Sequence, residues 1–193
     1  LSEDSIMKGE FEPTNEGYAL AKITITRLCE YIAREDKSFL YKTVIPCNLY
    51  GKFDNFDYSN SHMIPGVIRK IHDAKNNKLE FVNIWGDGLA RREFMYAADF
   101  ADFIYYAIEN FFKMPQNINV GIGFDYSIIE YYKIIAKEIN YHGKLNHDLT
   151  KPIGVKEKLI DNKRLNNFGW THKTSLKLGI KNTYSFFLKE ILY

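Results

Sequence analysis

A long helical stretch followed directly by a short apolar strand is the feature that most limits the fold of this chain. Thr14 or Asn15 can cap a helix that runs to about Arg34. Residues 39–45 form a β-rich run closed by Pro46, which is typical of a buried strand. Because no tight hairpin separates the two elements, their order predicts an α/β arrangement.

The first helix is predicted to supply both buried apolar residues and a candidate catalytic pair. Its apolar residues are spread around much of its circumference, which predicts burial on more than one side. They are Leu20, Ile23, Ile25, Leu28 and Ile32. Tyr18 and Lys22 are i,i+4 neighbours on one face, and no other Tyr-x-x-x-Lys occurs in the chain. A phenol has a pKa of about 10, and a fixed ammonium beside it lowers that pKa, so the pair is suited to proton transfer.

The remaining chain alternates between predicted helices and extended segments. Helices are expected at 62–75, 99–112, 127–140, 162–167 and 175–192, and extended segments at 81–84, 92–96, 118–120 and 145–147. The polar loop 48–61 is long enough to be a candidate functional loop. Gly121-Ile122-Gly123 is not a dinucleotide fingerprint, because Tyr126 occupies the third glycine position.

The composition is that of an ordinary soluble protein. Of the 193 residues, 46% are apolar and 26% are charged, and the net charge of +2 argues against a nucleic-acid partner. No apolar run approaches about 18 residues and no signal peptide is recognisable, so we expect no membrane partner. Cys29 and Cys47 have neither a metal nor a redox spacing, which indicates a reduced compartment. The expected location is the cytoplasm, with no bound metal.

Several short motifs, found in chain order, carry a resemblance to a known family. They are Glu12-Pro13-Thr14-Asn15-Glu16, Tyr18-x-x-x-Lys22, Pro46-x-Asn48-Leu49-Tyr50-Gly51, Asp54-Asn55-Phe56, Ser59-Asn60-Ser61-His62, and Trp85-Gly86-x-Gly88 followed by Arg92-Glu93-Phe94. Together they resemble the GDP-L-fucose synthases, which are extended short-chain dehydrogenases/reductases. The similarity runs from about Glu12 to Leu188, and the asparagine-rich loop ending in Ser-His is its most specific part.

The resemblance implies a fold and an activity. The fold would be a partial Rossmann-type parallel sheet with a smaller α/β substrate-binding lobe. Residues 1–61 would end the cofactor domain, and 62–193 would form mainly the substrate lobe, with about 92–125 returning to the cofactor domain. The activity would be NADPH-dependent 3,5-epimerisation and 4-reduction of a GDP-4-keto-6-deoxy sugar, with NADP(H) as cofactor. A homodimer through the catalytic helix is also implied.

The resemblance also implies roles for individual residues. Tyr18 matches the proton donor to the C4 oxygen, Lys22 its ammonium partner, and His62 the epimerisation acid. Cofactor contacts carry over to Lys22, Pro46, Cys47, Asn48, Leu49 and His62, and substrate contacts to Lys70, Trp85, Arg92 and Lys158. Ligands of open α/β sheets sit beyond the strand ends, an arginine fork suits phosphate, and an indole can stack on a base. The alternatives are an ion pair with Glu93 or a nearby acid for Arg92 and core packing for Trp85.

The chain departs from the family pattern in three respects. Lys70 stands where the family usually has arginine, and Ile153 stands where it shows a substrate-contacting aspartate. The Gly-rich phosphate loop, the catalytic serine and the epimerase cysteine are missing from residues 1–193. We therefore expect a carboxyl-terminal part of a longer enzyme, inactive alone, in which Cys47 serves as backbone lining. The alternatives are a reductase without epimerase activity, a nucleotide-sugar 4-epimerase, and a non-catalytic fragment that binds the nucleotide sugar.

Overall fold

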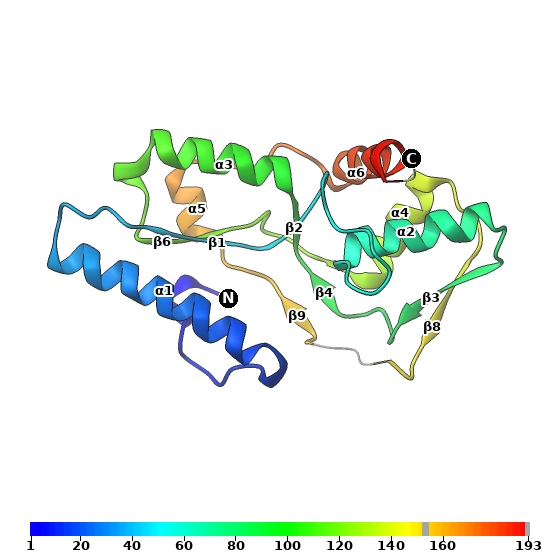
Figure 1. Ribbon diagram of the computed structural model, residues 1–193, viewed down its shortest axis with the longest axis horizontal. Coiled ribbons are helices and arrows are strands. Elements are labelled where there is room, and N and C mark those ends of the chain that lie inside the picture. Colours follow the sequence, from blue (N-terminus) through cyan, green and yellow to red (C-terminus); the bar gives the residue numbers. More distant parts are fainter. Residues whose placement is uncertain (152–154, 192–193) are drawn as a thin grey trace.

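Helices and strands alternate along the chain, as the sequence predicts. The computed structural model describes residues 1–151 and 155–191 (Figure 1). The helices are α1 (Glu16–Glu35), α2 (Met63–Asn76), α3 (Ala97–Glu109), α4 (Ile128–Ile139), α5 (Lys163–Phe168) and α6 (Leu176–Glu190). The strands are β1 (Thr43–Pro46), β2 (Asn48–Tyr50), β3 (Phe81–Trp85), β4 (Arg91–Arg92), β5 (Phe94–Tyr96), β6 (Asn117–Val120), β7 (Tyr126–Ser127), β8 (Lys144–Asp148) and β9 (Glu157–Lys158). Short 3₁₀ turns lie at Glu3–Ser5, Pro13–Asn15 and Phe111–Lys113.

Most strand pairs are parallel. β1 pairs with β6, β2 with β5, and β3 with β8, each in parallel register. β4 lies between β7, which is antiparallel to it, and β9, which is parallel to it. Parallel strands need long crossovers, and each crossover here contains a helix, such as α2 between β2 and β5. The predicted α/β class with parallel pairing is confirmed.

Two clusters of buried apolar side chains form the core. The first joins α2, α4 and α6 to β3 and includes Ile64, Ile68, Ile71, Tyr131, Ile135, Ile180 and Phe187. The isoleucines of α2 recur at i, i+4 and i+7, so they share one helix face. The second cluster packs α3 and α5 against β6 and includes Phe103, Ile118, Val120, Leu165 and Trp170. Figure 1 shows these two groups of helices at opposite ends of the chain's long axis.

The burial predicted for α1 is wrong. Only Thr26 and Glu30 are buried on this helix, whereas Leu20, Ile25 and Leu28 each remain more than half exposed. The packed face of α1 is fixed by polar contacts, because the Glu30 carboxylate accepts a hydrogen bond from the Asn117 side chain. Figure 1 shows α1 beside β1 and β6, away from the α2, α4 and α6 group. Within the described residues, its apolar face is uncovered.

Some strand boundaries also differ from prediction. The strand expected over 39–45 begins only at Thr43, and the rings of Phe39 and Tyr41 stack on each other before it, with centroids 6.0 Å apart. β2, β7 and β9 were not predicted. The last two contain two residues each, too few to show a period of two in the sequence.

Candidate active site

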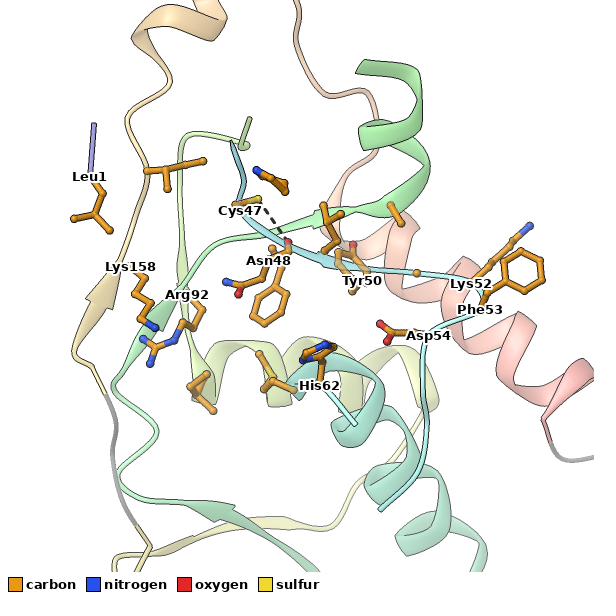
Figure 2. Close-up of a pocket in the computed structure, with 18 of the residues that line it drawn as sticks. Leu1, Cys47, Asn48, Tyr50, Lys52, Phe53, Asp54, His62, Arg92 and Lys158 are labelled. Atoms are coloured by element: carbon orange, nitrogen blue, oxygen red, sulfur yellow. Dashed lines mark hydrogen bonds between the residues drawn. The ribbon is translucent and has the colours of Figure 1, made fainter. Parts of the chain in front are cut away.

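One large cavity gathers most of the predicted site residues. Its volume is about 750 Å³, which is within the usual range for ligand sites. From the predicted set it is lined by Tyr18, Pro46, Cys47, Asn48, Leu49, His62, Arg92 and Lys158. Figure 2 shows the segment from Cys47 to Tyr50 on one side of the cavity and His62, at the start of α2, on the other. Residues from five separate parts of the chain therefore converge on a single space.

The strand-end segment of the cavity is held by backbone and side-chain hydrogen bonds. Cys47 lies between β1 and β2, and its N–H donates to the Val120 carbonyl at 2.9 Å. The Asn48 side chain donates to the Glu93 carbonyl at 2.8 Å. This segment follows the carboxyl end of a parallel strand, which is where open α/β sheets bind ligands.

Cys47 lines the cavity but is not suited to act as a nucleophile. Burial, reinforced by the nearby Glu93 carboxylate, raises the pKa of the Cys47 thiol to about 12. A thiol with that pKa stays protonated at neutral pH, and the thiolate is the reactive form. The interpretation of Cys47 as a lining residue agrees with this environment.

His62 is placed for contact with a ligand. It occupies the N-cap position of α2, but its side chain makes no capping hydrogen bond within the described part of the chain. The residue is exposed, and Figure 2 shows its ring facing the cavity between Asn48 and Asp54. An imidazole has two ring nitrogens and can either donate or accept a proton. The site thus holds a group suited to proton transfer at carbon.

Arg92 and Lys158 place two positive charges at one end of the cavity. They are register partners on the parallel strands β4 and β9, and Figure 2 shows their side chains next to each other. Nη1 of Arg92 donates to the carbonyls of Arg91 and Val155, each at 2.7 Å. Burial lowers the pKa of Arg92 from its ordinary value, yet a guanidinium remains charged at any physiological pH. The expected alternative for Arg92, an ion pair with Glu93, does not occur among the described residues.

Tyr18 and Lys22 are brought together, but only Tyr18 reaches the cavity. Both lie near the start of α1, and the Lys22 Nζ lies 5.5 Å from the centroid of the Tyr18 ring. Tyr18 is 68% exposed and lines the cavity, whereas Lys22 is absent from the described lining. The predicted i,i+4 arrangement is therefore present at the edge of the site.

Lys70 and Trp85 lie next to each other outside the lining of this cavity. The Lys70 Nζ is 5.8 Å from the Trp85 ring centroid and donates to the Asn83 carbonyl at 3.1 Å, and burial lowers the pKa of Lys70. Lys151 approaches the same ring at 5.7 Å. Trp85 is 63% exposed, which excludes core packing as its role. Ile153, the other departure from the family pattern, lies outside the described residues.

Several lining residues have no role predicted from the sequence. They include Lys52, Phe53, Asp54, Met63, Phe94 and Ile160. Lys52 and Phe53 belong to the long loop 48–61, and loop length was the only available signal for them, whereas Asp54 and Phe94 also stand in the quoted family motifs. Met63, Phe94 and Ile160 are apolar residues whose position on the cavity wall depends on tertiary packing.

Residues 1–151 and 155–191 contain neither a metal-binding cluster nor a membrane-spanning helix. In these residues no group of three or more His, Cys, Asp or Glu side chains could hold a metal ion. None of the helices described there has the length and apolarity needed to cross a membrane.

Known proteins resemble this chain over most of its length. It is 62% identical over 190 residues to the GDP-L-colitose synthase of Yersinia pseudotuberculosis, which covers 98% of this chain and 62% of that protein. It is 48% identical over 188 residues to a GDP-L-fucose synthase of Azorhizobium caulinodans, covering 97% of this chain and 60% of that protein. A GDP-mannoheptose C4 reductase from Campylobacter jejuni, solved with NADP bound, matches with a TM-score of 0.85 at 27% identity, over 98% of this chain and 65% of that one.

The chain spans about three fifths of the length of the curated relatives it matches. A family model matches it independently over residues 2–123, which is more than half of the 193 residues. That stretch includes α1 with Tyr18 and Lys22, the strand-end segment, His62 and Arg92. The chain belongs to the NAD dependent epimerase/dehydratase family.

Proposed function

We propose that the protein is an NADPH-dependent 3,5-epimerase/4-reductase of a GDP-4-keto-6-deoxy sugar. One observation carries this proposal: a single cavity is lined by a phenol, an imidazole, two cations and the end of a parallel strand. The names of the relatives support the substrate class, since they are GDP-L-colitose and GDP-L-fucose synthases.

Reduction of the C4 ketone would use Tyr18. When bound, the nicotinamide supplies a hydride to carbon. Tyr18 donates its proton to the C4 oxygen, so that the carbonyl becomes an alcohol, and the Lys22 ammonium beside the ring stabilises the phenolate left behind. Pro46, Cys47, Asn48 and Leu49 form the wall against which the nicotinamide would lie. Lys22 would hold its ribose.

Epimerisation would use His62. A proton on a carbon next to a ketone is acidic, so a base removes it from one face and an acid returns a proton to the other. His62 would be the acid that returns the proton, because its ring faces the cavity and an imidazolium can donate a proton. The matching base is not assigned within residues 1–193.

The GDP part of the substrate would lie towards the cationic end of the cavity. Arg92 and Lys158 would bind the diphosphate, since a guanidinium and an ammonium both pair with phosphate oxygens. Trp85, exposed between Lys70 and Lys151, would offer its indole face to the base.

The residues present fit the nicotinamide half of NADP(H) better than its phosphates. The strand-end wall suits a planar ring, but residues 1–193 contain no Gly-rich turn for the diphosphate. We therefore propose that 1–61 complete a cofactor domain, that 62–193 form mainly a substrate lobe, and that 92–125 return to the cofactor domain. We also propose a cytoplasmic homodimer in which α1 meets its copy, because its apolar face is exposed.

The test is an assay of the protein as its host encodes it. It is incubated with NADPH and the GDP-4-keto precursor of L-fucose in deuterated buffer, and the product is examined by mass spectrometry. We expect oxidation of NADPH, the GDP-L-fucose product, and deuterium at the two epimerised carbons. Absence of NADPH oxidation would refute the proposal.

A second candidate product is GDP-L-colitose, which the 62% identity to a GDP-L-colitose synthase favours. The two are separated by offering the keto precursor of each sugar and comparing kcat/KM. Reduction without deuterium incorporation would instead identify a reductase without epimerase activity.

A further inference from the structure

Glu93 forms hydrogen bonds with three separate segments of the chain around the cavity, at Asn48, at residues 122–123 and at Ile160. We propose that it is a positioning residue that holds Arg92 and Lys158 in register for the diphosphate of the substrate. This inference rests on the proposed function, because the ligand concerned is the GDP-sugar.

Glu93 is the single residue between β4 and β5. β4 ends at Arg92 and pairs with β9, whereas β5 begins at Phe94 and pairs with β2. The chain therefore passes from one sheet to another at this residue. The Glu93 carbonyl also accepts the hydrogen bond from Asn48, so its backbone contacts the strand-end wall.

The side chain of Glu93 accepts hydrogen bonds from two further segments of the chain. Its carboxylate is completely buried, with 0% exposure. Oε1 accepts from the backbone N–H groups of Ile122 at 2.6 Å and Gly123 at 2.8 Å, in the passage from β6 to β7. Oε2 accepts from the Ile160 N–H at 3.2 Å, in the passage from β9 to α5. One carboxylate thus joins segments that are about 30 and 67 positions away in the sequence.

Backbone amides compensate the charge of this carboxylate. Among the described residues, no lysine or arginine forms an ion pair with Glu93. Gly121 permits the close approach, since a methyl group on its Cα would collide with Oε1. Burying a charge costs free energy that good hydrogen bonds only offset, so net stability is a poor reason for this arrangement. Its effect is to fix geometry.

The hydrogen bonds of Glu93 bear directly on the placement of Arg92 and Lys158. Lys158 lies two residues before Ile160 and opposite Arg92 in the β4–β9 register. Release of the Ile160 N–H would loosen β9 from β4, so Lys158 would no longer be held opposite Arg92 in the strand register. We expect this change to weaken binding of the diphosphate, which is the part of the ligand that Arg92 and Lys158 would contact.

The test compares Glu93→Gln with Glu157→Gln in the protein as its host encodes it. Both remove one negative charge from the region of the β4–β9 pair, but Glu157 is an exposed β9 residue whose side chain makes no hydrogen bond or ion pair with another segment among the described residues. In Glu93→Gln, one amide N–H of the new side chain must face a backbone N–H, whichever way it is turned. The lost hydrogen bond holds the protein and not the ligand, and complete removal of an exposed cation raises Kd by about fivefold at most, so Kd for GDP should rise by about two- to fivefold in Glu93→Gln.

The direction of the change in Kd for GDP distinguishes a positioning role of Glu93 from the simple electrostatic effect of its charge. Removing an anion near two cations would by itself strengthen GDP binding, and Glu157→Gln should show no weakening. We expect Glu93→Gln to raise KM for the GDP-sugar with little change in kcat. We also expect faster amide exchange at 121–123 and 158–161, while Glu93→Asp, which keeps the charge with a shorter reach, should give an intermediate Kd. If Glu93→Gln does not fold, Glu93→Asp carries the same comparison.

Two results would overturn the inference in different ways. Unchanged GDP binding in the Glu93 variants, beside normal binding by the unsubstituted protein, would refute the positioning role alone. Failure of the unsubstituted protein to bind GDP would refute the proposed function, and the positioning role with it.

Discussion

Arg92 and Lys158 should contribute unequally to nucleotide binding. Arg92 is partly buried, and two carbonyls at 2.7 Å orient its guanidinium before any ligand arrives. Lys158 is exposed, so water screens its charge and its side chain must be ordered on binding. We therefore expect Arg92→Ala to weaken GDP binding more than Lys158→Ala.

The expected changes in Kd for GDP follow from the environments of Arg92 and Lys158. A hydrogen bond to a charged group contributes about 1.5–3 kcal/mol, which corresponds to a rise in Kd of roughly 10- to 100-fold for Arg92→Ala. An exposed charge pair contributes about 0.2–1 kcal/mol, so Lys158→Ala should raise Kd by about fivefold at most. Arg92→Lys should fall between the alanine variant and the unsubstituted protein, because it keeps the charge but loses the fork.

Calorimetric titration with GDP at low and high salt is the assay. The effect of Lys158→Ala should shrink at high salt, while that of Arg92→Ala should persist, since buried charges are screened less. Lys156→Ala is the matched control, because this exposed lysine is not among the described residues that line the cavity. Equal losses in Lys156→Ala and Lys158→Ala, or an Arg92→Ala variant that binds GDP normally, would refute the reasoning.

Four further outcomes are expected. Tyr18→Phe should lower turnover by about 10²–10⁴, and near-normal ketone reduction would remove Tyr18 from the mechanism. His62→Asn should abolish solvent deuterium exchange at one sugar carbon while some C4 reduction survives; unchanged exchange would favour a reductase without epimerase activity. In a Cys29→Ser background, iodoacetamide at about pH 8 should leave Cys47 unmodified, because its raised pKa keeps the thiol protonated, and rapid labelling would contradict this. Residues 1–193 expressed alone should neither bind NADPH appreciably nor stay monomeric, and micromolar binding by a folded monomer would contradict the proposed division of the cofactor site.

Long elements with a clear period could be predicted from the sequence. α2 and α4 have isoleucines at helical spacing, and their predicted ranges agree with the structure to within about one residue, inside the usual uncertainty of helix ends. Arg92 falls within the extended segment predicted at 92–96, but β4 as a separate strand and β9 could not be predicted in the same way. Each contains two residues, and their pairing joins Arg92 to Lys158, far apart in the sequence, through tertiary packing alone.

The site was predictable to the extent that its residues belong to contiguous motifs. The segment 46–49 and His62 belong to such motifs, and the structure places them on one cavity. Lys70, on α2, and Trp85, at the end of β3, also belong to recognisable positions but do not line this cavity. For Glu93 the sequence suggests only an ion pair with Arg92, since nothing in it indicates that a carboxylate will meet three backbone amides.

The uncovered apolar face of α1 has a consequence for how activity depends on protein concentration. Tyr18 is carried by a helix that the rest of the described chain anchors along only one face. If a second copy covers the other face, association and the placement of the proton donor become linked equilibria. Specific activity would then fall on dilution before the protein unfolds, and substrate, by stabilising the productive position of Tyr18, would shift the midpoint of that fall to lower concentration.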